Sequence, residues 1–317
     1  MVDVSIVIVC MNNVKQLFPC LDSIKKYTSV TYEVFVVAYL FTPENLKLLR
    51  ETYPDVKVIE SNEIRGFSEN NNLALRQAEG RYCFVVNDDT ELRMNTIDRL
   101  VKTIDGLPDD VAVISPNIIY PDGRAQCCGR PPFTWRHWVA NKLHLWKVSD
   151  DRKYSNKSGV FQSYNISGAA FMIRTDVFRE FGLFDERFFF CPEDIALSTS
   201  VNKKGYKCYV DADAYLVHDG GMSGKSFSMT QTATLPAAVK GMLLYYSAGN
   251  KLALYALSVV MFVVIGINFV YHYVSGRMKD KPNKNMIYSI AELNTLRVIF
   301  KKSTPKEVFI HYYNKKR

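Results

Sequence analysis

The chain lacks a cysteine pattern that would mark a zinc-bound or disulfide-stapled protein. Its seven cysteines are an odd number, no zinc-like spacing occurs, and Cys127 and Cys128 are adjacent, which is too constrained for ordinary pairing with each other. Four others lie in or beside apolar runs, where a free thiol behaves as a small buried hydrophobe; they are Cys10, Cys83, Cys191 and Cys208. We therefore expect reduced thiols and a cytoplasmic compartment.

Internal repeats, low-complexity segments and an excess of glycine or proline are also absent, which excludes solenoid, collagen-like and disordered classes of protein. No basic stretch precedes the first apolar run, so we expect no signal peptide. With 317 residues, 48% of them hydrophobic, the chain can bury the core of one large α/β domain with an appendage, or of two modest domains.

Excess positive charge is confined to one end of the chain. The formal net charge is +8, and the residues after Ser275 hold 11 lysines and arginines against three acids, so residues 1–275 are formally neutral. A neutral body argues against a nucleic-acid groove. A basic tail indicates contact with anionic lipid or an acidic partner, with a solvated charged tail as the alternative.

Short apolar runs rich in β-branched residues alternate with helical patterns. We expect strands at residues 4–11, 33–40, 56–59, 82–86, 111–114 and 168–173, and helices around Leu21 and at residues 43–53, 71–78 and 175–181. This alternation predicts βαβ units and hence an α/β fold with a mostly parallel sheet and flanking helices. Residues 121–159 are irregular, and we interpret them as an insert that shapes a substrate site.

Residues 252–274 carry no formal charge and are long enough to span a bilayer of about 30 Å. Cations flank both ends, including Lys251 and Arg277, so a single span would place one cluster outside, against the positive-inside tendency. We therefore favour an interfacial or re-entrant hairpin, with a true span and a buried soluble helix as alternatives. The expected domains are a compact α/β domain at 1–235 and a membrane-associating helical segment with a basic tail at 236–317.

Asn87, Asp88, Asp89 and Thr90 directly follow a buried apolar strand. In open α/β sheets ligands bind beyond the carboxyl ends of the strands, and two carboxylates with an amide form an oxygen-rich corner that suits Mg2+ or Mn2+. Such an ion can neutralise the charge of a departing nucleoside diphosphate. Taken alone, the motif also fits a helix N-cap or an Asx turn.

Two further polar features can complete such a site. Glu193 and Asp194 follow an aromatic run at the expected start of a helix, where burial and the helix end can tune the pKa of a general base; the alternative is a pair of capping acids. His218 ends an apolar run and precedes the glycine-rich residues 219–224, which can meet a phosphate or metal and close over a donor. The alternative there is a surface histidine beside a flexible turn.

Seven segments, in order over roughly the first 225 residues, together resemble family 2 glycosyltransferases, and among them the rhamnosyltransferase-like proteins of bacterial surface-polysaccharide pathways. The segments are VSIVIV (4–9), GFSENNNLAL (66–75), EGRYCFVVNDDT (79–90), SGAAFMIR (167–174), GLFDERFF (182–189), the pair Glu193 and Asp194, and HDGGMS (218–223).

The resemblance implies a GT-A fold, a nucleotide-sugar donor, a divalent cation (Mg2+ or Mn2+) and inversion at the anomeric carbon. It assigns the principal metal ligand to Asp89, with His218 near metal and diphosphate. It assigns the catalytic base to Asp194, with Glu193 orienting acceptor or base. The residues that it places on the donor side are Asn12, Asn71, Asn87, Asp88, Gly168 and Ala169.

The chain departs from the family pattern at the end of the second expected strand. Relatives usually carry there an acid that contacts the nucleotide base or ribose, and this chain has Ala38. After Glu193 and Asp194, the common second acid is Ala196 and the basic residue a turn later is Ser200. Base recognition and donor identity are therefore left open, while the metal and base positions are retained.

These residues together predict a single displacement, in which Asp194 removes the proton from an acceptor hydroxyl as it attacks the anomeric carbon of a dTDP-rhamnose or UDP-sugar type of donor. The expected acceptor is a glycan or lipid-linked glycan of surface polysaccharide biosynthesis. The expected location is the cytoplasmic face of the inner or plasma membrane, peripheral or single-pass, with no nucleic-acid partner. Two alternatives are a catalytically inactive glycan- or nucleotide-binding member of the fold and a membrane scaffold protein.

Overall fold

The computed structural model describes residues 2–127, 129–145, 157–220, 230–278 and 283–314, and it divides into two compact units. The first comprises Met1–Pro132, Val148–Asp185 and Asp194–Gly221. The second comprises Phe133–Lys147, Glu186–Glu193 and Met222–Arg317. Two short segments from the first 235 residues therefore group with the C-terminal helices.

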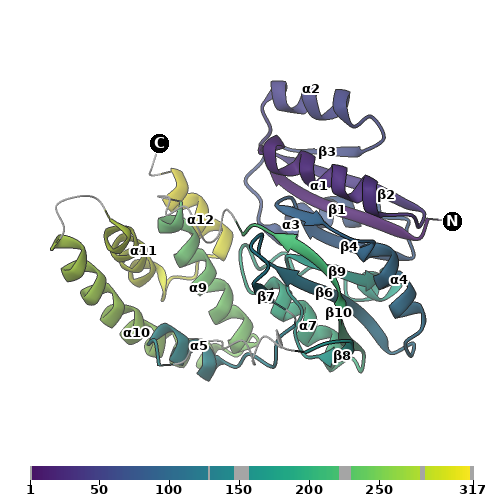
Figure 1. Cartoon of the computed structure of the whole chain (residues 1–317). Helices are drawn as coiled ribbons and strands as arrows, with labels where there is room; N and C mark the ends of the chain where they lie inside the picture. Colours follow the sequence, from purple (N-terminus) through teal and green to yellow (C-terminus); the bar gives the residue numbers. More distant parts are fainter. Residues whose placement is uncertain (1, 128, 146–156, 221–229, 279–282, 315–317) are drawn as a thin grey trace. The chain divides into compact units, whose positions relative to one another are not determined.

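The first unit is built around one ten-stranded sheet (Figure 1). Its strands are β1 (Val4–Met11), β2 (Tyr32–Tyr39), β3 (Lys57–Ser61), β4 (Tyr82–Asn87), β5 (Thr90–Leu92), β6 (Val111–Ile119), β7 (Ala125–Cys127), β8 (Val160–Ser163), β9 (Ala170–Arg174) and β10 (Lys207–His218). The order is β3-β2-β1-β4-β9-β6-β10-β5, with β7 beside β6 and β8 beside β10. From β3 to β4 neighbouring strands are parallel, whereas β9 runs antiparallel to both β4 and β6.

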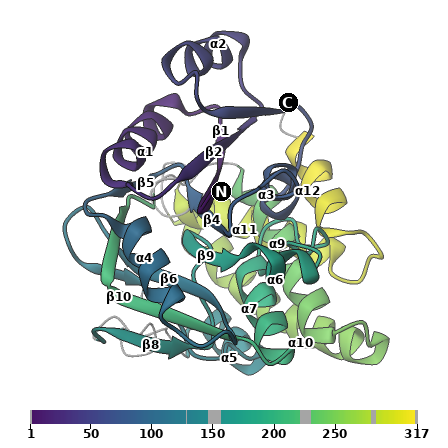
Figure 2. The ribbon, with the colours of Figure 1, turned by 90° about the vertical axis from the view of Figure 1, so that its right-hand side faces the viewer.

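Helices cover both faces of this sheet (Figure 2). They are α1 (Val14–Tyr27), α2 (Pro43–Thr52), α3 (Phe67–Leu75), α4 (Thr96–Asp105), α6 (Thr175–Glu180) and α7 (Glu193–Lys203). Along β1, Ile6 and Ile8 pack in a core with residues of α1 and α4, while Val7 packs in a second core with residues of α3 and α6. A strand covered on both faces needs an unbroken apolar run, which is why its sequence does not alternate.

The strands and helices that we expected lie close to their observed positions, except that β6 is longer and α3 is displaced; β5, β7, β8 and α4 were not expected. We expected a helix at residues 71–78, but α3 begins at Phe67 and ends at Leu75. The Gly66 N–H donates a hydrogen bond to the Glu69 carboxylate at 3.1 Å, an interaction typical of a helix start. In the irregular stretch at residues 121–159, the structure places β7 and the helix α5 (Trp135–Lys142), and residues 146–156 lie outside the described residues.

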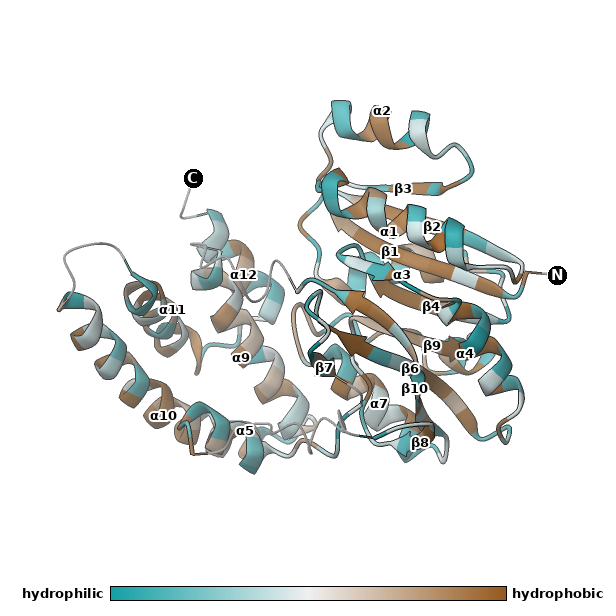
Figure 3. Cartoon of the chain, in the orientation of Figure 1, coloured by the Kyte–Doolittle hydropathy of each residue, from teal (hydrophilic) through white to brown (hydrophobic). Residues whose placement is uncertain are grey.

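The second unit is helical. It contains α5, α9 (Gln231–Ser247), α10 (Lys251–Arg277), α11 (Lys284–Val298) and α12 (Pro305–Asn314). Trp138, Met242, Met261 and Val264 share one apolar core. Among the described residues, α10 is the one helix long and apolar enough to cross a membrane, and only 22% of its most apolar stretch is buried. Hydrophobic residues run along much of α10 (Figure 3).

Candidate active site

The acidic turn follows β4, and local hydrogen bonds hold it in place. The N–H of Asn87 donates to the Ala169 carbonyl at 3.0 Å, and the Thr90 hydroxyl donates to the Asn87 carbonyl at 2.8 Å. Burial raises the pKa of Asp88 to about 6, with a smaller contribution from the negative charge of Asp89. A hydrogen bond from the Cys10 thiol lowers this pKa but does not outweigh burial. The turn therefore places two neighbouring acids at the end of β4, and the pKa of Asp88 is the one that burial raises.

The end of β10 brings His218 to this turn. β5 pairs antiparallel with β10 so that His218 lies opposite Thr90, and the N–H of Asp219 donates to the Asp89 carbonyl at 3.0 Å. Nε2 of His218 lies 3.1 Å from Oδ1 of Asp89, and both side chains are mostly buried. The structure thus brings together the two predicted metal ligands, which are far apart in the chain.

The surroundings of the His218 ring fit a cation. Nδ1 lies 2.5 Å from Oε1 of Gln126, while Nε2 faces Asp89 and lies 3.4 Å from the Asn87 amide nitrogen. Donation of the Nδ1 proton to Gln126 leaves a lone pair on Nε2 directed at a carboxylate, and these two electron-rich atoms need a shared proton or cation. A carbonyl oxygen on the far ring nitrogen commonly supports a metal-binding histidine. The residues present therefore fit Mg2+ or Mn2+.

The protein alone supplies few metal ligands near Asp89 and His218. Within the described parts of the chain, no group of three or more His, Cys, Asp or Glu side chains is placed to hold a metal ion. Asp89 and His218 would supply two ligands, and phosphate oxygens and waters would have to supply the rest. This division is usual for Mg2+ at phosphate-binding sites, where one or two protein groups act together with the substrate.

Asp194 approaches the same edge of the sheet from the start of α7. Its Oδ2 accepts a hydrogen bond from the Gly168 N–H at 3.3 Å, and its Oδ1 accepts one from the Ile195 N–H at 2.8 Å. Gly168 lies just before β9, whose first residue pairs with β4 one residue before Asn87. A Cβ at position 168 would lie 3.4 Å from the Asp194 Cβ, an ordinary van der Waals distance, so the backbone of Gly168 lies directly against this side chain. Asp194 and the acidic turn therefore flank the same strand ends.

Glu193 directly precedes Asp194 and makes a contact within its own loop. Its carboxylate accepts a hydrogen bond from the N–H of Cys191. This contact is consistent with a capping acid at the start of α7, which was the structural alternative for this residue. An orienting role for Glu193 stays a prediction.

Two predicted donor-side residues have structural partners. The side-chain oxygen of Asn12 accepts hydrogen bonds from the Thr42 N–H at 3.0 Å and the Asn45 amide at 2.9 Å, which ties the end of β1 to α2. Asn71 is 1% exposed, and its amide donates to the Phe67 carbonyl at 2.9 Å. Neither side chain is hydrogen-bonded to Asp89 or His218 in the described residues, and their donor roles stay predictions.

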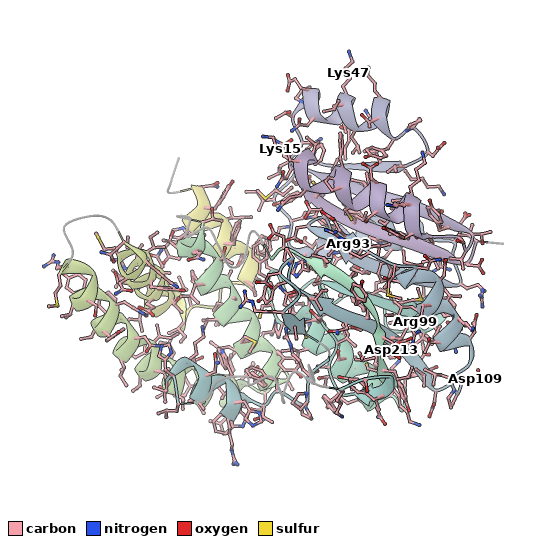
Figure 4. The ribbon with its side chains drawn as sticks, in the orientation of Figure 1. Lys15, Lys47, Arg93, Arg99, Asp109 and Asp213 are labelled. Carbon is pink, nitrogen blue, oxygen red and sulfur yellow. The ribbon has the colours of Figure 1, made fainter. Side chains whose placement is uncertain are left out.

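A pocket of about 180 Å³ opens beside Asp89. Two cations from different elements line it, Lys15 on α1 and Arg93 after β5, both labelled in Figure 4. Arg93 also pairs with Glu91 of the same pocket at 2.9 Å. Asp194 does not line this pocket. The lining of the pocket holds these two cations and three acids, Asp89, Glu91 and Asp219, so a phosphorylated ligand there would need a further cation to balance its charge.

Sequence reasoning missed Gln126 and Cys10, although both contact the acidic turn or its histidine partner. Gln126 lies on β7, whose three residues are too short for a periodic signal. Cys10 was interpreted only as a buried thiol. The predicted closing loop at 219–224 cannot be followed to its end, since residues 221–224 lie outside the described residues.

Comparison with known families decides the classification. The family model described as Glycosyl transferase family 2 matches residues 5–182, more than half of the chain. This protein belongs to glycosyltransferase family 2. The resemblance seen in the motifs is thus confirmed. The matched region contains the acidic turn and Gly168, and it ends before Asp194 and His218.

This member of glycosyltransferase family 2 is similar to the O-antigen biosynthesis protein RfbC of Myxococcus xanthus, with 25% identity over 208 residues. That alignment covers 62% of this chain but only 15% of RfbC. The chain therefore corresponds to a small part of that relative.

Two solved glycosyltransferases share the fold. GalNAc-T7 with UDP, GalNAc and Mn2+ aligns with a TM-score of 0.55 and 20% identity, over 73% of this chain and 46% of that one. The mannosyltransferase PcManGT of Pyrobaculum calidifontis, in complex with GDP-Man and Mn2+, aligns with a TM-score of 0.52 and 16% identity, over 98% of this chain and 86% of that one. The predicted GT-A fold is confirmed.

Proposed function

We propose that this protein is an inverting, metal-dependent glycosyltransferase that moves a sugar from a nucleotide-sugar donor, of the dTDP-rhamnose or UDP-sugar type, to a glycan or lipid-linked acceptor. The observation that carries the proposal is that three polar features meet at one edge of the sheet. Asp89 contacts His218 at 3.1 Å, and Asp194 is hydrogen-bonded to Gly168 where β9 begins beside β4.

On the donor side, Asp89 and His218 would hold Mg2+ or Mn2+. When bound, the cation neutralises charge on the donor diphosphate. The related folds GalNAc-T7 and PcManGT were solved with nucleotides and Mn2+, which supports a donor of this class. The further donor contacts that we propose come from Asn12, Asn71, Asn87, Asp88, Gly168 and Ala169.

On the acceptor side, Asp194 acts as the general base. It takes the proton from an acceptor hydroxyl as that oxygen bonds to the anomeric carbon and the bond from this carbon to the diphosphate oxygen breaks. Attack opposite the leaving group inverts the anomeric carbon, and no covalent enzyme intermediate forms. The hydrogen bond from the Gly168 N–H holds the carboxylate in one orientation, and Glu193 orients the acceptor.

The biological setting that we propose is surface polysaccharide biosynthesis at the cytoplasmic face of the inner or plasma membrane. The named relative RfbC is an O-antigen biosynthesis protein, and the candidate membrane helix α10 would bring the enzyme to a lipid-linked acceptor. In this proposal residues 1–235 perform the transfer and residues 236–317 attach the enzyme to the membrane.

A donor panel tests the proposal. Purified protein with acceptor should release nucleoside diphosphate from one donor only when Mg2+ or Mn2+ is present. Asp194→Asn should lower turnover by about 10²- to 10⁴-fold, the usual contribution of a general base, while the protein stays folded. The matched control is Asp176→Asn, because Asp176 also accepts a 2.8 Å bond from the next N–H at a helix start but is exposed. Full activity of Asp194→Asn would refute the base assignment.

A second candidate is a catalytically inactive glycan- or nucleotide-binding member of the fold. The observation that favours it is the end of β2, where Ala38 is 1% exposed and replaces the acid that relatives use for the nucleotide. Calorimetry with nucleoside diphosphates, with and without Mn2+, distinguishes the two. A binding protein would show affinity without turnover on any donor and acceptor.

A further inference from the structure

The helix α10 exposes one continuous apolar face. Seven of its large hydrophobic side chains are 53% to 77% exposed. Five of them are separated by three, four or eleven positions, which places them on one side of the helix; they are Leu252, Val263, Ile267, Val270 and Val274, and the other two are Tyr255 and Tyr271. At 1.5 Å per residue this face runs for roughly 33 Å. No charged residue interrupts it. An exposed apolar surface of this length is typical of an interaction site.

The opposite face of α10 holds its polar residues inside the helical unit. The Asn268 amide donates to the Lys142 carbonyl at 2.8 Å, and Nδ1 of His272 lies 2.9 Å from a Glu292 oxygen. Ser258 is also buried. A helix that faces water shows the reverse pattern, with polar residues outward and apolar residues inward. The surroundings that this pattern fits are hydrocarbon outside and protein inside.

The charges at the ends of α10 and in the sequence that follows it favour a membrane as the partner. Lys251 and Arg277 stand at the two ends of α10, and the residues after Ser275 carry a surplus of eight cations. Basic residues next to an apolar surface attract anionic lipid headgroups. Tyr255, Tyr271 and Tyr273 are exposed on the same helix, and tyrosine is enriched where membranes meet water.

The packing of α10 shows how it can meet the membrane. Met261, Val264 and Ile265 pack with residues of α5, α9 and α11, and a Cβ at Gly276 would lie 3.1 Å from Met286 of α11. Partner helices thus follow α10 along most of its length. If α10 crossed the bilayer, these helices would enter the hydrocarbon with it, including charged residues such as Glu292, at a high energetic cost.

We propose that α10 lies in the plane of an anionic membrane surface, with its exposed apolar face at the boundary between headgroups and acyl chains. This inference rests on the membrane partner of the proposed function, and it specifies how α10 associates with that membrane. Its tests use no turnover, so a failure of the membrane mode is distinguishable from a failure of the transferase proposal.

Flotation of the full chain with vesicles tests the surface. The wild type should float with vesicles of phosphatidylcholine and phosphatidylglycerol, and less with phosphatidylcholine alone. Val263→Glu combined with Val270→Glu should lower the bound fraction by about ten-fold or more, because two carboxylates enter the apolar boundary. The control Val160→Glu changes an exposed valine of β8 and should bind as wild type. Unchanged flotation of the double variant overturns the proposal. The proposal is also overturned if the wild type does not bind vesicles but forms a dimer in lipid-free solution that the double substitution dissociates.

Labelling of the two helix ends tests the orientation. Lys251→Cys and Arg277→Cys should both react with a membrane-impermeant maleimide in inverted membrane vesicles, and neither should react in right-side-out vesicles. Mass spectrometry of the labelled peptides separates these sites from the native cysteines. Reaction of the two ends from opposite sides would show that α10 crosses the membrane and would overturn the in-plane arrangement.

A different observation concerns how His218 reaches Asp89. From Cys208 opposite Val113 to Asp211 opposite Pro116, β10 follows β6 residue by residue, but the next pair is Tyr215 with Asn117. Three residues of β10 therefore bulge out of the pairing. Since side chains alternate along a strand, such a bulge determines which face and which position His218 takes at the strand end.

Asp211 holds this bulge and is fully buried. Its carboxylate accepts hydrogen bonds from Arg99 at 2.9 and 3.1 Å, from the Thr103 hydroxyl at 2.8 Å, and from two N–H groups inside the bulge. The Thr96 hydroxyl donates to the Tyr215 carbonyl at the far end of the bulge at 2.6 Å. Thr96, Arg99 and Thr103 lie on one face of α4, and Figure 4 labels Arg99 together with Asp213 of the bulge.

We infer that Asp211 is a positioning residue that acts through His218. The inference rests on the proposed metal role of Asp89 and His218. Asp211→Asn should weaken Mn2+ binding by up to about 10-fold in calorimetry, the lower end of the effect of removing a residue bonded directly to a metal ligand, because Asp211 acts on His218 through the backbone of β10. Turnover at saturating Mn2+ should stay near the wild-type value.

Two other variants provide a matched control and a substitute in case Asp211→Asn does not fold. Asp105→Asn is the matched control, because Asp105 also lies on α4 and pairs with an arginine, Arg81, but does not touch β10. Thr96→Val removes one bond to the bulge and should weaken Mn2+ binding in the same direction if Asp211→Asn does not fold. Normal Mn2+ affinity in folded Asp211→Asn or Thr96→Val overturns the inference. Mn2+ binding that survives His218→Ala would instead refute the metal role itself.

Discussion

The central strands of the first unit and α10 of the second unit place polar and apolar side chains in opposite ways. In the first unit the central strands bury apolar residues on both faces, and Asp89 and His218 gather where strands end. In the second unit α10 turns apolar residues outward and Asn268 and His272 inward. An uncharged apolar run in the sequence therefore does not predict burial, because the run of β1 lies in a core and the run of α10 leaves one face exposed.

The largest expected effect is on turnover in Asp89→Asn, and it distinguishes a polar group that takes part in catalysis from one that stabilises the fold. Asp89→Asn should lower turnover by about 10²- to 10³-fold, because it removes a preorganised charge from the site. The unfolding temperature should stay equal or rise, since Asp88 loses a like-charged neighbour. Diphosphate release and thermal unfolding measure the two effects. Asp109→Asn, on an exposed residue, should change neither. A large loss of stability in Asp89→Asn would contradict this separation.

The next prediction compares the same substitution in both units. Ile8 is 0% exposed in β1, and Ile267 is 55% exposed on α10. Ile8→Ala should lower the free energy of unfolding by about 2–5 kcal/mol, because it leaves a cavity in the core. Ile267→Ala should change it by less than about 0.5 kcal/mol in lipid-free solution. Urea unfolding followed by circular dichroism measures both, and equal losses would break the comparison.

A pH-dependent prediction concerns Glu33 at the edge of the first unit. Burial acts to raise its pKa, but hydrogen bonds from Lys57, Ser5 and the Glu79 N–H outweigh it, so the pKa of Glu33 is lowered. A lowered pKa in the folded state stabilises the protein above the unfolded-state pKa of Glu, and this stability is lost as the pH falls through the folded value.

Glu33→Gln should therefore cost about 1.5–3 kcal/mol at pH 7, the range for hydrogen bonds to a charged group. The difference in the free energy of unfolding between Glu33→Gln and wild type should shrink as the pH falls below the pKa of free glutamic acid. Denaturant titrations from pH 7 to pH 3 measure it. A difference that grows toward acid pH would contradict the sign of the pKa shift.

The smallest expected effect tests the inward polar face of α10. Asn268→Leu removes the hydrogen bond to the Lys142 carbonyl and should cost about 1 kcal/mol of unfolding free energy. Ala256→Leu, at an exposed position of the same helix, should cost nothing measurable. Thermal unfolding of the full chain compares them. A stabilising Asn268→Leu would show that the inward polar groups do not support the second unit.

The sequence predicted much of the fold because most of its signals are local. The apolar run of β1 and its end at the acidic turn of β4 follow from hydrophobic patterning, which does not depend on distant residues. The motifs also placed the chain in its family. The start of α3 was predicted wrongly because the link between Gly66 and Glu69 was overlooked, although its residues were visible.

By itself the sequence determined the alternation of strands and helices that marks an α/β fold, the family, the acidic turn and the uncharged stretch of α10, since each depends on residues near one another in the chain. Only the tertiary structure decided that His218 faces Asp89, that Gln126 contacts its ring, that Asp211 bonds to the bulge of β10, and that α10 turns its apolar side outward. The physical reason is that strand pairing, a bulge and the burial of one helix face depend on packing between distant segments.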